Sequence, residues 1–128
     1  MMIDFRSLAG PAGVALVGRA LMALLFILAG IAKVTDPTPV LNQMREFSVP
    51  TALFLPVVAL EIGGGIALLL GLRVRDVAGA LGIFCILAAF IFHHDLADKV
   101  ERSIFFKDLA IAGGLLALAV RAALARPV

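Results

Sequence analysis

Charged side chains are scarce in this sequence. Asp, Glu, Lys and Arg make up 16% of its 128 residues, whereas 62% of the residues are hydrophobic. An ordinary soluble domain has about 25% charged and roughly 45–50% apolar residues. A soluble domain of this length could not bury so much apolar side chain, because a small globule leaves a large share of its residues in water. The composition therefore excludes an ordinary soluble globule and indicates that lipid surrounds the folded chain.

Several site types are also missing. The chain has one cysteine, Cys85, so it lacks an internal disulfide and a CxxC redox pair. His93 and His94 are adjacent and would lie ~100° apart on a helix, which argues against a shared metal or a haem. The glycines at 63–65 lie within an apolar run without a following Lys-Ser/Thr, so they are not a phosphate loop. With one cysteine and two adjacent histidines, we expect no metal site. No catalytic triad is visible. The sequence also has no basic run, so we expect no nucleic-acid partner.

Long apolar runs are what the sequence does have. A helix needs about 20 apolar residues to cross the hydrocarbon core of a bilayer. The runs predict an all-α, integral membrane four-helix bundle that forms one domain over residues 1–128. The expected spans are residues 14–34, 53–72, 77–94 and 105–124.

The connections between the spans differ in character. Residues 40–47, VLNQMREF, predict a short amphipathic helix at the membrane interface. The polar segment HHDLADKVERSI is expected to continue the third helix before the chain turns. The short RVRD connection and the basic C-terminal end favour both termini in the cytoplasm, because positive charge in short loops stays inside.

Glu61 is the single charge between Pro56 and Gly71. An ionised carboxylate in such a helix is costly unless it is protonated or paired with a cation. Spacings of three and four place polar and small residues on one face of each helix, and small-residue faces are contact faces between helices in lipid. The expected inward faces are Arg19, Ala23, Phe26, Gly30 and Lys33; Val57, Glu61, Gly64, Leu68 and Gly71; Gly79, Gly82, Ile86, Ala89 and His93; and Lys107, Ala110, Gly114, Ala117 and Arg121.

These faces predict a polar cluster inside the bundle. We expect it to open towards the end with the longer connections and to have Glu61 as its floor. Arg19, Lys33 and Lys107 all remain open as the partner of Glu61, and a purely structural ion pair is the competing interpretation. The candidate members of the cluster or ligand site are Glu61, Arg19, Lys33, Lys107, Asp108 and His93.

The series GRALMALLFILAGIAKVTDP, FSVP, LEIGGGIALLLGLRVR and FFKDLAIAGGLLAL resembles the DoxX family of small four-helix bacterial membrane proteins. The resemblance extends from Gly18 to about Leu118. It implies a multi-pass protein of the bacterial inner membrane. Carried over position by position, it singles out Arg19, Lys33, Glu61, Lys107 and Asp108. Members of the family are associated with membrane redox complexes, whereas this chain has no evident redox centre or cofactor of its own.

Two main functional hypotheses follow. In the first, the chain is a quinone-binding or lipid-binding subunit of a membrane redox complex, in which Glu61 and a nearby cation contact the head group. In the second, the chain is a non-enzymatic bundle that assists a partner protein or carries a small amphiphile. A small transporter is a further alternative, which would need a homo-oligomer to form a pathway. The bilayer is a partner in every case, and whether the chain is an enzyme stays open.

Overall fold

A computed structural model describes residues 10–125, and the helices within them confirm the predicted fold class. Four segments are long and apolar enough, by length and composition, to cross a membrane. The first is α2 (Pro11–Thr35), and the second combines the short 3-10 turn η1 (Thr51–Leu53) with α4 (Phe54–Leu70). The third and fourth are α5 (Val74–Phe92) and α6 (Lys99–Ala125). The predicted interfacial helix is also present, as α3 (Thr38–Glu46).

The turn between α4 and α5 is tighter than the predicted spans allowed. Gly71 ends α4 in the left-handed conformation, with φ of 75°, and the Leu72 amide donates to the Ala67 carbonyl at 2.8 Å. Such a glycine cap stops a helix because it satisfies the last carbonyl groups without another helical turn. Asp76 then lies in the first turn of α5 and accepts hydrogen bonds from Arg73. A carboxylate is favourable at a helix N-terminus, so α5 begins three residues before the predicted residue 77.

The expected continuation of the third helix into HHDLADKVERSI is wrong. Helix α5 ends at Phe92, and the second half of this segment belongs to α6. The Asp98 side chain accepts hydrogen bonds from the amides of Val100 and Glu101, at 2.9 and 3.1 Å. This is the contact of an N-capping residue, and it starts a helix earlier than the hydrophobic run alone would predict.

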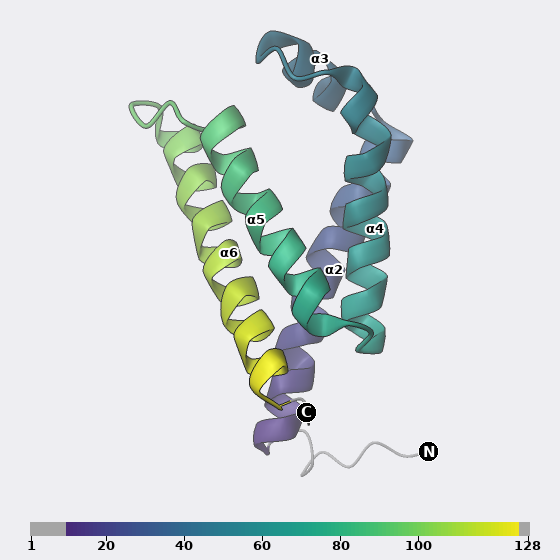
Figure 1. Cartoon of the computed structure of the whole chain (residues 1–128). Helices are drawn as coiled ribbons and strands as arrows, with labels where there is room; N and C mark the ends of the chain where they lie inside the picture. The colour runs from purple at the N-terminus through teal and green to yellow at the C-terminus, as the bar shows by residue number, and fades with distance from the viewer. Residues whose placement is uncertain (1–9, 126–128) are drawn as a thin grey trace.

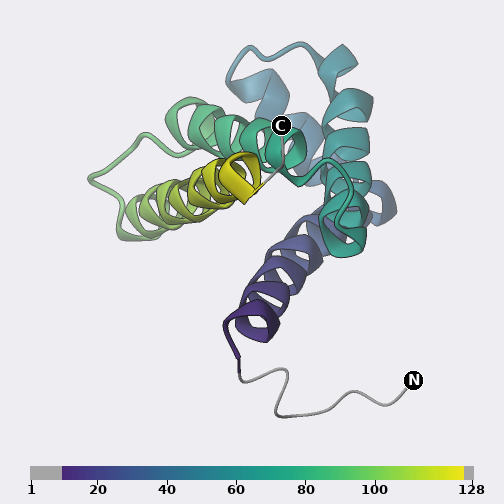
Figure 2. The same ribbon diagram turned by 60° about the horizontal axis from the view of Figure 1, so that its bottom comes forward.

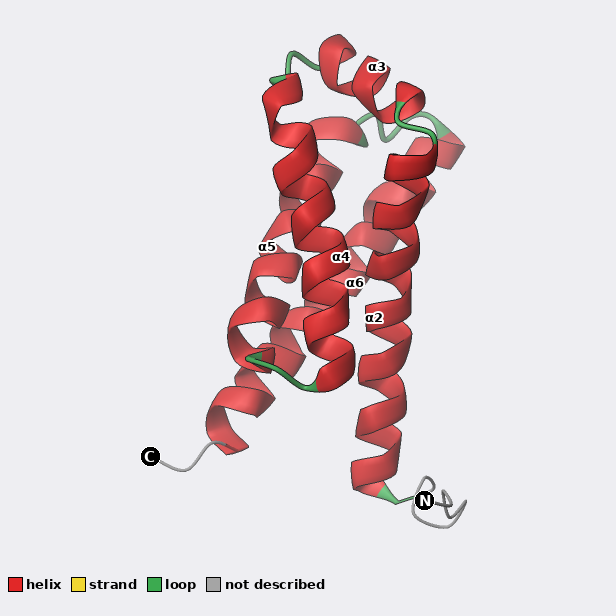
Figure 3. Ribbon diagram, turned by 90° about the vertical axis from the view of Figure 1, so that its right-hand side faces the viewer, coloured by secondary structure: helices red, strands yellow, loops and turns green. Residues whose placement is uncertain are grey.

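The helices pack as two pairs that form a V. Helix α2 lies along α4 and α5 lies along α6, while the two pairs meet through a smaller contact between α4 and α5. Figure 1 shows the pairs close together near the termini and apart at the other end, where α3 lies. Figure 3 shows the same arrangement from the side, with α3 across the top and the start of α2 and the end of α6 at the bottom.

The core of the bundle lies in the closed half of the V. Its buried residues come from all four long helices: Ala23, Phe26, Leu68, Ala78, Leu81, Cys85, Ala112 and Leu115. Gly64 permits the two pairs to meet there, because a Cβ atom at that position would lie 3.2 Å from a methyl group of Leu81. Close approach at small residues is a main source of helix association in lipid. The opposite half therefore stays open between the pairs.

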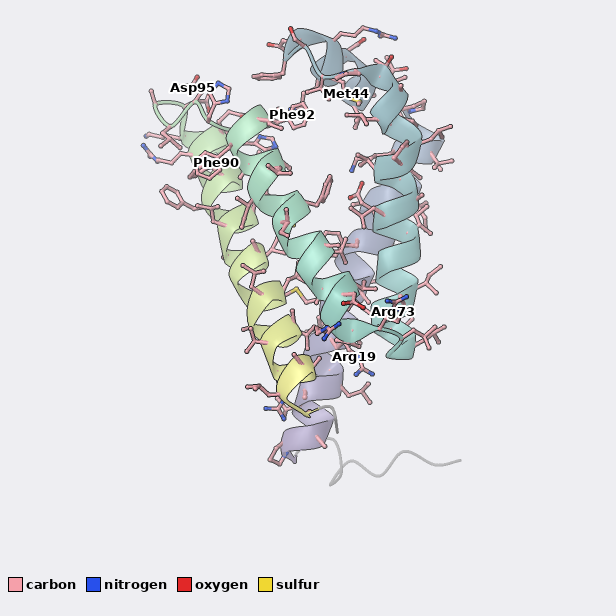
Figure 4. The ribbon with its side chains drawn as sticks, viewed as in Figure 1. Arg19, Met44, Arg73, Phe90, Phe92 and Asp95 are labelled. Carbon is pink, nitrogen blue, oxygen red and sulfur yellow. The ribbon has the colours of Figure 1, made fainter. Side chains whose placement is uncertain are left out.

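Helix α3 and the residue that follows it cover part of the open half. The Met44 side chain is buried and 4% exposed. Phe47, directly after α3, makes edge-to-face contacts with Phe92 and His94 at the end of α5, each with 5.6 Å between ring centres. Figure 4 shows Met44 and Phe92 at this end of the molecule. The segment after α2, which includes α3 and Phe47, thus reaches across from the first helix pair to the second.

Candidate functional site

A cavity of about 420 Å³ lies in the open half of the V. All four long helices and α3 contribute to its wall, which is mainly apolar. The polar side chains on the wall are Lys33, Gln43, Glu61, His93 and Asp108, together with the thiol of Cys85. An apolar cavity with a few convergent polar groups is the usual form of a small-molecule site.

Glu61 is paired with Lys33 on the neighbouring helix. The Lys33 Nζ atom lies 2.7 Å from Oε1 of Glu61, and the two side chains are 20% and 4% exposed. At this distance the ammonium group compensates the charge of the carboxylate, and no other described residue donates a hydrogen bond to Oε1. The pair therefore neutralises the carboxylate but leaves hydrogen-bonding capacity at the cavity wall.

A second group of polar side chains faces the cavity from α6 and the end of α5. Asp108 and His93 both line it, on the side formed by the second helix pair. The His93 Nδ1 atom lies 2.8 Å from Oε2 of Glu101, which lines a more polar depression outside the cavity, beside Glu46 and Asp95. His93 thus connects the cavity wall to a carboxylate near the aqueous surface. Glu101 was not among the predicted site residues, although it lies seven residues before Asp108 and therefore on the same helix face.

Arg19 does not belong to this cavity. Its guanidinium group lies near Gly71, where a Cβ atom would be 3.3 Å from Nη2. That position is the C-terminal end of α4, at the closed end of the V, and a cation is favourable there because of the helix dipole. Of the partners that the sequence left open for Glu61, the structure thus places Lys33 beside it and Arg19 at the other end of the bundle.

The predicted inward face of the fourth helix is wrong by one position. Lys107, Ala110, Gly114, Ala117 and Arg121 are exposed, whereas Phe105, Ala112 and Leu115 are buried and Asp108 is half-buried. The reason lies in the contact between α5 and α6, where the small residue is Gly82 of α5 and α6 contributes Leu115 and Leu116. The contact between α5 and α6 therefore does not use a small-residue stripe on α6. Lys107, which lies on that stripe, does not line the cavity.

The cavity also includes residues that the sequence argument did not assign to it. Cys85 is buried on the face of α5 that carries Ala89 and His93, so helical spacing could have placed it there. Gln43 and Met44 reach the cavity from α3. No periodicity within one helix could reveal that contribution, because it depends on how α3 folds back over the open end.

The arrangement suits a molecule with a polar head and an apolar body. Glu61 and Asp108 provide acceptor oxygens from opposite helix pairs, Lys33 provides a donor, and His93 provides either function. The remaining wall is formed by side chains such as Phe26, Phe54 and Phe84, which offer apolar contact. Such a site would hold a head group in one orientation through several hydrogen bonds.

Comparison with known proteins identifies relatives. The family model of DoxX matches residues 14–94. The chain is also 41% identical over 105 residues to the inner membrane protein YqjF of Escherichia coli (strain K12), an alignment that covers 82% of this chain and 81% of that protein. No solved structure matches the chain.

Proposed function

Because this chain belongs to the DoxX family and is a multi-pass protein of the inner membrane, we propose that its cavity binds a membrane-soluble amphiphile, most simply a quinone. The observation that carries the proposal is the position of the Glu61 and Lys33 pair, which lies on the wall of an apolar cavity rather than in solid packing. A pair that served packing alone would be expected to be enclosed by side chains on every side.

The chemistry of a quinone head group fits the polar residues on this wall. Its carbonyl oxygens accept hydrogen bonds, which Lys33 and His93 would donate, while a quinol hydroxyl donates to a carboxylate such as Glu61 or Asp108. The volume of about 420 Å³ lies within the roughly 300–1,000 Å³ of typical small-molecule sites. In this proposal the chain orients the head group and exchanges protons with it, and a partner protein of a membrane redox complex supplies or removes the electrons.

A second function is favoured by one specific observation. The 2.7 Å contact between Lys33 and Glu61 joins α2 to α4, so it would also fix the register of that helix pair. In this alternative the polar residues are structural, and the bundle assists a partner protein or carries a small amphiphile without redox chemistry. A buried polar contact that specifies one arrangement of helices has this kind of role in coiled coils.

Replacing Glu61 with glutamine separates these possibilities. In purified protein in lipid nanodiscs, we expect Glu61→Gln to weaken binding of a short-tailed ubiquinone about tenfold or more, because a hydrogen bond to a charged group contributes roughly 1.5–3 kcal/mol. Asp108→Asn is expected to weaken it as well, from the opposite wall. Equilibrium dialysis measures the affinity, and circular dichroism measures the melting temperature of the same samples.

Asp76→Asn is the matched control, since it also converts one carboxylate to an amide but lies on the exposed side of α5 beside Arg73. It should bind the quinone like the wild type. The quinone proposal is wrong if the wild-type protein binds none, or if Glu61→Gln and Asp108→Asn bind it unchanged. A wild type without quinone affinity, combined with a lower melting temperature for Glu61→Gln, would support the structural alternative.

A further inference from the structure

A second hollow lies at the opposite end of the molecule, between the first turns of α2 and the last turns of α6. Two arginines line this groove, Arg19 from α2 and Arg121 from α6, and the rest of its wall is small or apolar: Pro11, Val14, Ala15, Gly18, Met22, Gly114, Ala117 and Leu118. Figure 2 looks towards this end of the molecule, with the start of α2 and the end of α6 towards the viewer. The groove shares no residue with the cavity around Glu61.

The positive charge of the groove has no counterpart within residues 10–125. No acidic side chain of that part of the chain lines the groove. The nearest acidic position along the chain from the end of α4 is Asp76, which is already paired with Arg73 and Arg75. The Nε atom of Arg19 is buried and has no hydrogen-bond partner among the described residues. The C-terminal end of the α4 helix dipole is favourable for the charge of Arg19. It provides no hydrogen-bond acceptor for this N–H group and no counter-charge for Arg121.

The groove lies at the level where lipid head groups are expected. Arg19 packs beside Gly71, at the start of the connection between α4 and α5, which carries Arg73 and leads to Arg75 in the first turn of α5. A connection with exposed backbone and several charges belongs at the membrane surface, because unsatisfied polar groups are costly in hydrocarbon. Figure 4 shows Arg19 and Arg73 at this same end of the bundle, away from Met44.

The inner end of the groove is closed by a contact between α2 and α6. Met22 approaches Gly114 so closely that a Cβ atom on the glycine would lie 2.6 Å from its terminal methyl group. The two helices therefore touch at this point, which closes the inner end of the groove. Between this contact and Arg121, small residues such as Gly18 and Ala117 line the groove. They leave room for a head group beside the two arginines.

We propose that this groove binds an anionic phospholipid. Its phosphate group accepts hydrogen bonds from the guanidinium groups of Arg19 and Arg121, and its acyl chains lie against exposed apolar side chains of α2 and α6 such as Leu21 and Val120. Guanidinium groups bind phosphate through paired, charge-assisted hydrogen bonds, and basic pockets between transmembrane helices bind anionic head groups. The bound lipid would join the first and last helices, which have little direct contact with each other.

Native mass spectrometry of the full chain, released from detergent with added phosphatidylglycerol or phosphatidylethanolamine, tests this proposal. We expect the wild type to retain one phosphatidylglycerol about tenfold more tightly than the zwitterionic lipid, since charge-assisted hydrogen bonds distinguish the two. Arg121→Gln is expected to remove most of that preference. The variant should fold normally, because Arg121 is exposed near the end of α6.

Arg75→Gln is the matched control, because it removes the same charge at the same end of the bundle but outside the groove. It should keep the preference within about twofold, and Arg19→Gln should lose it as Arg121→Gln does. Equal retention of both lipids by the wild type overturns the proposal, and so does an equal loss in Arg75→Gln and Arg121→Gln. Quinone binding in the other cavity should be unchanged in Arg121→Gln, so the two proposals fail independently.

Discussion

Replacing Lys33 with methionine, with Glu61 left in place, is expected to lower the free energy of unfolding by about 3 kcal/mol. The Glu61 side chain is only 4% exposed, and the Lys33 ammonium group, 2.7 Å away, is the cation paired with it among the described residues. Methionine retains most of the apolar length of lysine, so the change removes the charge with little loss of packing. Unfolding in mixed micelles with increasing SDS, followed by circular dichroism, measures the difference.

Lys107→Met is the matched control for this prediction. Lys107 is also on a transmembrane helix, but it is exposed, and the described structure contains no ion pair for it. Its replacement should change stability by no more than about 0.5 kcal/mol. Combining Lys33→Met with Glu61→Met should recover much of the loss, because removing both charges leaves no unpaired carboxylate. Equal stabilities for Lys33→Met and Lys107→Met would show that the ion pair does not stabilise the bundle.

Gly65→Val is expected to destabilise the protein by about 2–3 kcal/mol through direct conflict between α2 and α4. A Cβ atom at Gly65 would lie 2.7 Å from Cγ1 of Ile27 and 2.9 Å from the carbonyl oxygen of Ala23. The backbone oxygen cannot rotate away as a side chain does, so the helices must separate. Since close packing drives helix association in lipid, separation weakens the pair along its length.

Gly63→Val provides a control two residues away in the same helix. A Cβ atom at Gly63 would meet no atom within 4 Å, because this glycine is exposed on the outer side of α4. Both substitutions carry the same change in helix propensity, so their difference reports the contact with α2 alone. If SDS titration gives the two variants equal stability, the close approach at Gly65 does not hold the pair together.

Hydropathy was sufficient to predict the four spans and their order, because each crossing needs its own long apolar run. It was less reliable at helix ends, which depend on local hydrogen bonds. With Asp98 as its cap, α6 begins at Lys99, six residues before the predicted residue 105, and Gly71 ends α4 at Leu70 instead of residue 72. Both residues are recognisable cap types, so the sequence contained the signal, but the apolar pattern outweighed it.

The candidate site was predictable one helix at a time. Lys33 and Glu61 were both assigned to inward faces, and His93 was assigned to the same end of the bundle, where all three now line one cavity. The fourth helix shows the limit of that reasoning. Lys107 and Asp108 were both candidates, and the small-residue stripe favoured Lys107. The structure turns Asp108 inward instead, because Gly82 on α5 already provides the space for close packing.

By itself, therefore, the sequence determined that the chain spans the membrane four times and that a carboxylate in the second span needs a partner, since both follow from the cost of polar groups in hydrocarbon. Only the tertiary structure decided that Lys33 is this partner, that Arg19 lies at the other end, and that the helices leave a cavity beside the pair. Those outcomes depend on how two helix pairs cross. The crossing is set by contacts between residues distant in sequence, which the periodicity of a single helix does not contain.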